Sequence, residues 1–427
     1  MREYNIDTCC VQGGYRPGNG EPRQVPIVQS TTFKYESSSE MGKLFDLEAS
    51  GYFYSRLQNP TNDTVAAKIC ELEGGTAAML TSSGQAASFY SVFNIASNGD
   101  HVISSSAIYG GTYNLFAVTM KRMGIEFTFV SPDISEEDLQ KEFRPNTKAV
   151  FGETIANPAL AVLDIEKFAR VAHANGVPLI IDNTFATPVN CRPFEWGADI
   201  VTHSTTKYMD GHGSGVGGCI VDSGKFDWTR YPDKFPGLCT PDESYHGVTY
   251  TERFGLEGAY ITKATAQLMR DLGSIQSPQN AYLVNLGLES LHVRMQRHCQ
   301  NGMAVAEFLQ NDDRISWVTY PGLKGSKDEE LVKKYLPNGT CGVVSFGVKG
   351  GREAAEKFMA GLKIAAIETH VADARSCCLH PASATHRQMS DEELIAAGVL
   401  PDLIRFSCGL ESSEDLINDI RCALDNI

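Results

Sequence analysis

The sequence predicts an α/β protein built on a mostly parallel sheet with helices on both of its faces. From residue 61 to about 265, short β-branched or apolar runs alternate with segments whose apolar residues have helical spacing, such as DIEKFARVAHANGV. Seven such runs predict seven strands, at 76–81, 101–105, 126–130, 149–153, 178–182, 199–203 and 217–221. Because ligands bind outside the carboxyl ends of strands in such sheets, the polar residues that follow each run are the candidate site residues.

Three regions are expected along the 427 residues. Residues 1–60 are rich in Gly, Pro, Gln and Ser with little periodicity, which predicts an irregular arm that contacts a neighbouring subunit. Residues 61–275 form the main domain, in which the aromatic-rich stretch 223–258 is interpreted as a long ordered loop. Residues 276–427 predict a smaller α+β domain with a helical start near Pro278. Two strand-like runs follow in it, at 343–348 and 365–371.

Composition and charge exclude several classes of protein. Apolar residues make up 42% and charged residues 21%, as in ordinary globular chains. The formal charge of −15 disfavours nucleic acid and anionic membrane surfaces as partners. The twelve cysteines form no C-x-x-C pattern, so we expect free thiols in a reducing cytosol and no metal site. Without an apolar leader or a spanning segment, the chain is expected to be soluble and cytoplasmic.

The first run is followed by Ser82-Ser83-Gly84-Gln85 and then by a helical segment. Backbone N–H groups and the positive end of the helix dipole at such a start can bind a phosphate. A serine N-cap without any ligand would give the same pattern, and both interpretations stay open on this segment alone.

A carboxylate, Asp182, closes the buried run PLIID. A carboxylate in that position is expected to be buried and paired. Its partner could be a protonated pyridine nitrogen, whose charge it would stabilise, or a structural cation or helix cap.

Lys207 follows the run DIVTH, between hydroxyl residues and a glycine-rich stretch. Desolvation at a strand end lowers the pKa of a lysine and makes its amine nucleophilic. Ser204 and Thr206 flank this lysine and can offer hydroxyls to a phosphate. The nearby Gly213, Gly215 and Gly218 satisfy G-x-G-x-x-G, but they lead into a strand instead of a helix, which disfavours a dinucleotide site.

The segment DIVTHSTTKYMDGHG (199–213) resembles the attachment signature for pyridoxal 5′-phosphate (PLP) of the Cys/Met-metabolism enzymes, a fold-type I family. The resemblance extends over nearly the whole chain, through YFYSRLQNPTNDT, SSGQAA, YGGT, ANP, DNTFATP, HPAS and RFSCGLE. It implies a fold-type I PLP transferase.

The resemblance also implies roles for residues around the cofactor ring. Lys207 is similar in position to the Schiff-base lysine, and Asp182 to the partner of the pyridinium nitrogen. Tyr109 corresponds to the tyrosine that stacks on the ring and can protonate a leaving group. Asn157 corresponds to the residue near the phenolic oxygen, and Arg405 to the arginine that binds the substrate α-carboxylate.

For the cofactor phosphate, the resemblance implies one set of residues from the same chain and a second set from a neighbour. The first set comprises Gly84, Gln85, Ser204 and Thr206. Tyr54 and Arg56 of the arm resemble the pair that reaches the site of the neighbouring subunit, where Tyr54 would also meet the substrate. The expected assembly is a homotetramer, a dimer of dimers with shared active sites.

Within the family, three segments resemble the O-acetylhomoserine sulfhydrylases: TCCVQGGYRPGNGEPRQVPIVQSTTFKY, PDESYHGVTYTERFG and THVADARSCCLHPASATHRQ. An insertion of roughly thirty residues around 223–258, relative to the shorter lyases, points the same way. The methionine γ-lyases typically have Cys two residues after the stacking tyrosine, where this chain has Gly111.

The expected reaction is γ-replacement on O-acetyl-L-homoserine. Sulfide would give L-homocysteine and acetate, and methanethiol would give methionine. A cystathionine γ-synthase, or a methionine or cystathionine γ-lyase, is the alternative within the family. A non-catalytic protein on the same fold is disfavoured, because Lys207, Asp182, Tyr109 and Arg405 are all present.

Overall fold

A computed structural model describes residues 4–384 and 399–427, and residues 385–388 of the last sulfhydrylase-like segment lie outside these ranges. Its main sheet has seven strands in the order β1-β7-β6-β5-β4-β2-β3. β7 is antiparallel to β1 and β6, and the other neighbours are parallel. The mostly parallel seven-stranded sheet is therefore confirmed. The strands are β1 (Ala77–Thr81), β2 (His101–Ser105), β3 (Glu126–Val130), β4 (Thr147–Glu153), β5 (Leu179–Asp182), β6 (Ile200–His203) and β7 (Gly218–Asp222).

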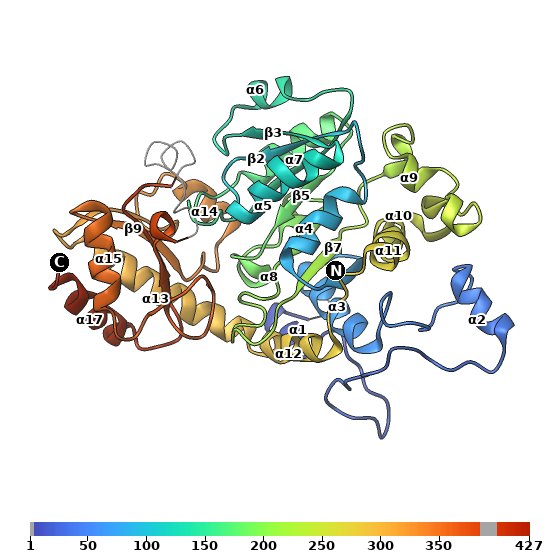
Figure 1. The fold of residues 1–427 in the computed structure, drawn as a ribbon, viewed down its shortest axis with the longest axis horizontal. Helices are drawn as coiled ribbons and strands as arrows, with labels where there is room; N and C mark the ends of the chain where they lie inside the picture. Colours follow the sequence, from blue (N-terminus) through green and yellow to red (C-terminus); the bar gives the residue numbers. More distant parts are fainter. Residues whose placement is uncertain (1–3, 385–398) are drawn as a thin grey trace.

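Helices cover both faces of this sheet (Figure 1). Consecutive residues of β5 pack on opposite sides, because side chains alternate along a strand. Leu179 and Ile181 belong to one buried cluster and Ile180 to the other. The first cluster includes residues of α3 (Pro60–Glu73) and α7 (Ile165–Ala174), and the second those of α4 (Gly84–Phe93) and α10 (Tyr250–Lys263). Burial on both faces explains why the strands appear in the sequence as continuous apolar runs.

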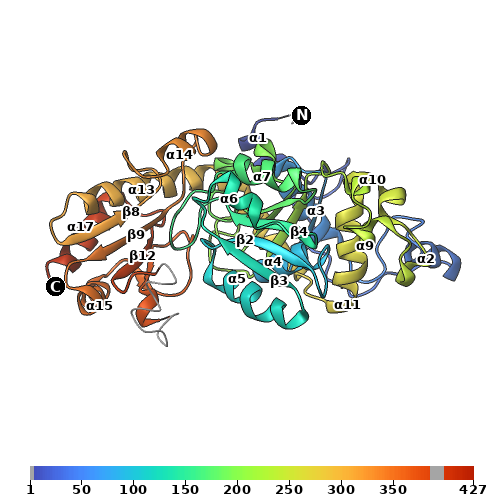
Figure 2. The same ribbon diagram turned by 90° about the horizontal axis from the view of Figure 1, so that it is seen from above.

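A second sheet of five strands, in the order β10-β11-β12-β9-β8, lies beside the first (Figure 2). The long helices α12 (Pro278–Glu289) and α13 (Leu291–Gln310) lead into it, and α15 (Gly351–Gly361) and α17 (Ser413–Leu424) pack on it. Its strands are β8 (Ile315–Thr319), β9 (Val343–Val348), β10 (Ala366–Ile367), β11 (Cys377–Leu379) and β12 (Leu403–Ser407). β10 is shorter than the run at 365–371, because the chain after it turns towards the main sheet, where Thr369 and Val371 line a cavity.

The interpretation of 223–258 as a loop is wrong in part. The stretch contains α9 (Pro236–Cys239) and two short 3-10 helices, and α10 begins inside it at Tyr250. Its aromatic residues are core residues: Trp228 is 1% exposed and stacks on Tyr260 of α10 with 5.6 Å between ring centroids. Burial of these rings orders the segment against the sheet.

The N-terminal arm is largely irregular, as expected. After α1 (Ile6–Gln12), no helix begins before α2 (Ser38–Phe45). In both views α2 stands away from the main sheet, on the side opposite to the second sheet (Figures 1 and 2). Arg253 of α10 donates a hydrogen bond to the carbonyl oxygen of Leu47 at 3.0 Å, which ties this part of the arm to the main body. Among the described residues, no helix is both long enough and apolar enough to cross a membrane.

Candidate active site

A cavity of about 240 Å³ lies where the carboxyl ends of β4, β5 and β6 meet. Nine of the eleven residues that the sequence singles out line it: Gly84, Gln85, Tyr109, Asn157, Asp182, Ser204, Thr206, Lys207 and Arg405. They come from distant parts of the chain and are brought together by the sheet and by β12. Tyr54 and Arg56 do not line it.

The amine of Lys207 sits in a poorly solvated position after β6. Burial, and secondarily the charge of Arg405, lower the pKa of Lys207 to about 8. The turn that holds it is fixed by a hydrogen bond from the Lys207 N–H to the Ser204 carbonyl (3.1 Å). A second bond runs from the Gly211 N–H to the Lys207 carbonyl (2.7 Å). An amine with this pKa has a substantial neutral, nucleophilic fraction near neutral pH.

Two carboxyl groups end adjacent strands, Glu153 on β4 and Asp182 on β5, and their residues are paired in register. Asp182 Oδ1 accepts a hydrogen bond from the Thr184 N–H at 2.9 Å. Burial raises the pKa of Asp182, and burial together with the charge of Asp182 raises the pKa of Glu153 well above its ordinary value. A nearby cation would relieve this, and Asp182 lines the cavity where such a cation could bind.

The first turn of α4 also lines the cavity. Ser83 caps the helix, with its hydroxyl accepting from the Ala86 N–H at 3.1 Å. The N–H groups of Gly84 and Gln85 lie in this first turn, where helices leave donors available for an anion. A Cβ on Gly84 would lie 2.6 Å from the Cβ of Ser204, so only glycine keeps this approach open.

Arg405 of β12 is only 6% exposed and is held by the backbone of another segment. Its Nη2 donates to the carbonyl oxygens of Thr369 and His370, both at 3.0 Å, and Nη1 donates to Asn157 Oδ1 at 3.4 Å. Its Nε is buried and lacks a hydrogen-bond partner among the described residues. A buried guanidinium with a spare donor is suited to bind a carboxylate.

Tyr109 precedes the short helix α5 (Gly110–Asn114), and its ring is 47% exposed at the cavity mouth. Its N–H donates to Glu153 Oε1 at 2.7 Å. A Cβ on Gly111 would lie 2.4 Å from Cε1 of the Tyr109 ring. The absence of a side chain at 111 is therefore what permits this ring position.

Several residues in or near the cavity were not singled out from the sequence, and three of them contact a predicted site residue through a polar group: Glu153, Thr184 and His370. Glu153 closes a buried run in the same way as Asp182, so the rule that found Asp182 would have found it. Thr184, whose Oγ1 accepts from the Ser204 N–H at 2.8 Å, also follows a strand. His370, whose Nδ1 is 3.4 Å from Lys207 Nζ, gave no local signal, because it is 163 residues away in sequence.

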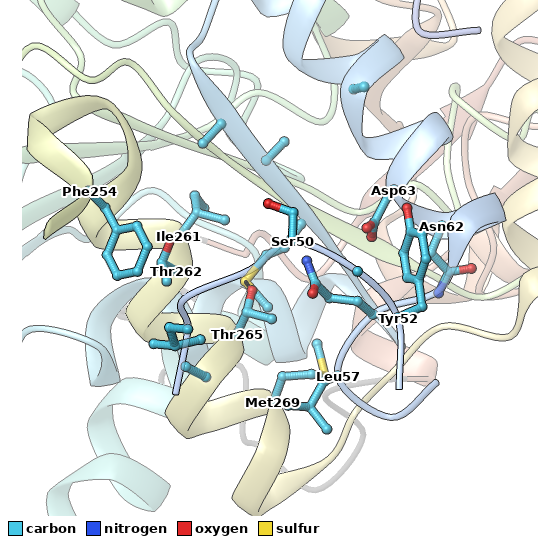
Figure 3. A pocket seen from close by; sticks show the side chains of 18 of the residues that line it. Ser50, Tyr52, Leu57, Asn62, Asp63, Phe254, Ile261, Thr262, Thr265 and Met269 are labelled. Carbon is cyan, nitrogen blue, oxygen red and sulfur yellow. Dashed lines mark hydrogen bonds between the residues drawn. The ribbon is translucent and has the colours of Figure 1, made fainter. Parts of the chain in front are cut away.

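Tyr54 and Arg56 lie on the arm, and their chain neighbours Phe53 and Leu57 line a larger cavity of about 1060 Å³ between the arm, α3, β1 and α10 (Figure 3). In Figure 3, Tyr52, Asn62 and Asp63 gather at one end of this cavity, and Phe254 and Ile261 at the other. The guanidinium of Arg56 lies 5.2 Å from the centroid of the Tyr54 ring and donates to the carbonyl oxygen of Arg270. Both side chains are exposed.

Residues 7–425 match the model of a protein family described as Cys/Met metabolism PLP-dependent enzyme. The chain belongs to this family. The resemblance expected from the sequence is thereby confirmed, and with it the PLP cofactor and the fold-type I architecture.

Individual relatives of this PLP enzyme align with it from end to end. The chain is 44% identical to a homocysteine synthase of Schizosaccharomyces pombe, over 100% of this chain and 99% of that protein. It is 42% identical to an O-acetyl-L-homoserine sulfhydrylase of Leptospira meyeri, over 100% and 98%. A crystal structure of a Campylobacter jejuni protein assigned as an O-acetylhomoserine (thiol)-lyase superposes with a TM-score of 0.95 at 37% identity, covering 99% of this chain and 100% of that one. That crystal structure contains N′-pyridoxyl-lysine-5′-monophosphate.

The cavity residues of this PLP enzyme fit the cofactor. They provide a lysine amine of lowered pKa, a carboxylate for a protonated ring nitrogen and a helix N-terminus for a phosphate. The space that a Cβ on Gly84 would fill is left open beside that helix.

Proposed function

We propose that this enzyme catalyses γ-replacement on O-acetyl-L-homoserine, in which sulfide displaces acetate and L-homocysteine is formed, or methanethiol gives methionine. The observation that carries the proposal is the end-to-end similarity to proteins named homocysteine synthase and O-acetyl-L-homoserine sulfhydrylase. The cavity supports it, because Arg405 offers a buried donor for an α-carboxylate and Lys207 offers an amine for proton transfer.

PLP, when bound, supplies an electron sink for the negative charge that develops on the substrate. Lys207 is proposed as the residue that carries the cofactor, and its free amine then removes the Cα proton and afterwards a proton from Cβ. Asp182 holds a proton on the ring nitrogen by charge. Loss of the Cβ proton allows acetate to leave from Cγ. The thiol then adds to Cγ with loss of its own proton, and protons return to Cβ and Cα.

The substrate and the cofactor phosphate are held by the remaining cavity residues in this proposal. Arg405 binds the α-carboxylate through the guanidinium N–H groups that its hydrogen bonds to backbone carbonyl oxygens leave free. Tyr109 covers the ring at the cavity mouth, and Asn157, held against Arg405, lies near the phenolic oxygen. The first turn of α4 (Gly84, Gln85) and the hydroxyls of Ser204 and Thr206 hold the phosphate. In this structure the Thr206 hydroxyl donates to the Gly217 carbonyl at 3.1 Å and accepts from the Gly217 N–H at 3.0 Å, so its proton must turn away from that carbonyl to reach a phosphate.

Gly111 is relevant to whether the enzyme catalyses γ-replacement or γ-elimination. Any side chain there would displace the Tyr109 ring from its present position. We therefore expect a site adapted to replacement, with weak cleavage of methionine.

The test is acetate release from O-acetyl-L-homoserine, measured with and without sulfide, together with 2-oxobutanoate release from methionine. We expect sulfide-dependent acetate release with homocysteine as the product, and slow 2-oxobutanoate formation. Efficient 2-oxobutanoate production from methionine would assign the enzyme to the lyases instead. The Lys207→Ala variant is the control that removes the proposed chemistry.

We further propose a homotetramer, built as a dimer of dimers, in which Tyr54 and Arg56 of one chain complete the site of its neighbour. Both residues are exposed and lie outside the cavity of their own chain, beside the large cavity under the arm. Tyr109 at the cavity mouth is also half exposed, as expected of a surface that a second chain covers. All twelve cysteines are free, which supports a place in the reducing cytoplasm.

A further inference from the structure

His370 is the hydrogen-bond partner of the Lys207 amine. Its Nδ1 lies 3.4 Å from Lys207 Nζ, and the part of the chain that the structure describes offers this amine no other hydrogen-bond acceptor. The two residues come from different sheets: Lys207 follows β6, and His370 lies between β10 and β11. The imidazole of His370, from a segment between two strands of the second sheet, thus contacts the amine of Lys207.

The other ring nitrogen faces a buried carboxylate. His370 Nε2 is 3.7 Å from Oδ2 of Asp373, a residue that is 1% exposed. Arg375 fixes this carboxylate with bonds from its N–H and its Nε to Oδ1, both at 2.9 Å. Gly213 has φ +63°, and a Cβ there would lie 2.7 Å from Asp373 Oδ2, so this glycine permits the close packing.

The backbone of His370 is also held from the active-site side. Its carbonyl oxygen accepts from Arg405 Nη2 at 3.0 Å and from the thiol of Cys377 at 3.2 Å. The backbone of His370 is therefore fixed by contacts independent of Lys207, and its ring Nε2 is buried 3.7 Å from Asp373 without a hydrogen-bond partner among the described residues. A residue held in this way is suited to position the amine of Lys207.

The charges around the imidazole favour its neutral form. Burial, followed by the charge of Lys207, lowers the pKa of His370, while Asp373, Glu368 and Asp210 oppose this shift. With the Lys207 amine donating to Nδ1, the ring proton belongs on Nε2, facing Asp373. A neutral imidazole is an acceptor for the amine, whereas a protonated one would repel an ammonium group.

We propose that His370 is a positioning residue that holds the amine of Lys207 during the part of the catalytic cycle in which this amine is not bonded to the cofactor. The inference rests on the proposed function for its place in the cycle, but not for its geometry. Held on Nδ1, the amine keeps a fixed direction towards the cavity. As the pH falls and the imidazole takes up a proton, the acceptor is lost and the amine is released.

Two substitutions test this in the cofactor-loaded enzyme. His370→Asn keeps an acceptor without a titrating ring, and His370→Leu removes the acceptor. We expect His370→Leu to lower kcat about tenfold, the effect of losing one such hydrogen bond, while KM changes little. In His370→Asn, kcat should stay near wild type, and the loss of activity on the acid side should move to lower pH. Wild-type kcat in His370→Leu, or an unmoved acid limb in His370→Asn, would overturn the proposal.

A second readout does not depend on turnover. In cofactor-free protein, the rate at which acetic anhydride labels Lys207, followed by peptide mass spectrometry, reports the pKa of its amine. Loss of the acceptor disfavours the ammonium form, so His370→Leu should lower the labelling midpoint by about one pH unit. His370→Asn should keep the wild-type midpoint. The exposed His246 supplies the matched control, His246→Asn, which should change neither measurement.

The two readouts separate this inference from the proposed function. A shifted midpoint in an enzyme that lacks sulfhydrylase activity would reject the proposed reaction and retain the role of His370. An unshifted labelling midpoint in an enzyme with sulfhydrylase activity would reject the positioning role of His370 and leave the proposed reaction intact.

Discussion

At the scale of single residues, Glu153 and Asp182 are the two buried carboxyl groups that line the cavity. Glu153 also organises two loops, because its Oε1 accepts from the Tyr109 N–H at 2.7 Å and its Oε2 from the Asn157 N–H at 3.2 Å. One carboxyl group therefore fixes the backbone of the proposed ring-stacking residue and that of a second cavity residue. Its raised pKa follows from this buried position beside another carboxylate.

The raised pKa predicts how stability depends on pH. Because folding favours the protonated form of Glu153, its contribution is fully present below the ordinary pKa of 4.5 and is lost as pH rises through the raised value. In wild type, the thermal midpoint should fall as the pH rises through the raised pKa of Glu153. In Glu153→Gln this fall should be smaller, because the amide does not titrate. The substitution should also cost about 1–3 kcal/mol, because the amide nitrogen, unlike a carboxyl oxygen, cannot accept from the N–H group that it would face.

Thermal midpoints of wild type and Glu153→Gln between pH 4.5 and 8 would check this. Glu307→Gln, at an exposed position on α13, is the matched control and should follow wild type. An identical pH dependence in wild type and Glu153→Gln would show that Glu153 does not bind its proton more tightly in the folded state.

At the scale of elements, the first turn of α4 and the turn after β6 approach each other at Gly84 and Ser204. The distance of 2.6 Å from a Cβ on Gly84 to the Ser204 Cβ leaves no room for alanine without moving one of the two turns. Both turns belong to the proposed phosphate site. The distance between the two turns is thus set by the close approach of the Gly84 backbone, which carries no side chain.

Gly84→Ala should consequently weaken PLP binding. Overpacking of this kind costs about 1–3 kcal/mol, which corresponds to roughly a ten- to hundred-fold loss of affinity. The check is cofactor absorbance after dialysis against increasing volumes of buffer. Gly42→Ala, on α2 with no atom within 4 Å of the added Cβ, should retain the cofactor as wild type does. Equal retention in Gly84→Ala would remove α4 from the phosphate site.

The elements that could be predicted are those whose signal is local. Each of the seven apolar runs became a strand, because burial on both faces of a parallel sheet requires an apolar run. α10 was missed because Gly255, at φ 65°, breaks its helical geometry near the start and aromatic residues hide its periodicity. Lys207 and Asp182 follow strands and could be found, whereas the approach of His370 to Lys207 depends on how two sheets pack.

At the scale of the whole molecule, the N-terminal arm (residues 1–60) is the part whose position is least accounted for by packing against the rest of the chain. Leu44 and residues 47–53 line the large cavity together with residues of α3 and α10, so the arm and the main domain enclose a space that neither fills (Figure 3). A cofactor phosphate needs cations in a chain with a formal charge of −15. Arg56 is an exposed cation on this arm, which supports its use in the site of a second chain.

Sharing of the site between two chains can be tested by mixing two damaged proteins. A two-fold dimer places the same arm of each chain against the other, so each site would contain Lys207 from one chain and Arg56 from its partner chain. Arg56→Ala and Lys207→Ala proteins should each be nearly inactive. After subunit exchange about half of the dimers are mixed, and each mixed dimer holds one intact and one doubly damaged site, so roughly a quarter of wild-type activity should return.

Exchange itself must be verified in the mixture, by carrying a mass label on one of the two proteins and measuring the mixed species by native mass spectrometry. A control mixture of Lys207→Ala with a Lys207→Ala, Arg56→Ala double variant should recover nothing, because no site then contains an intact lysine. If the first mixture also stays inactive while mixed dimers are present, Arg56 acts within its own chain. The cation that the cofactor phosphate needs would then have to come from the same polypeptide, and the contact of Arg56 with the Tyr54 ring would need a different function.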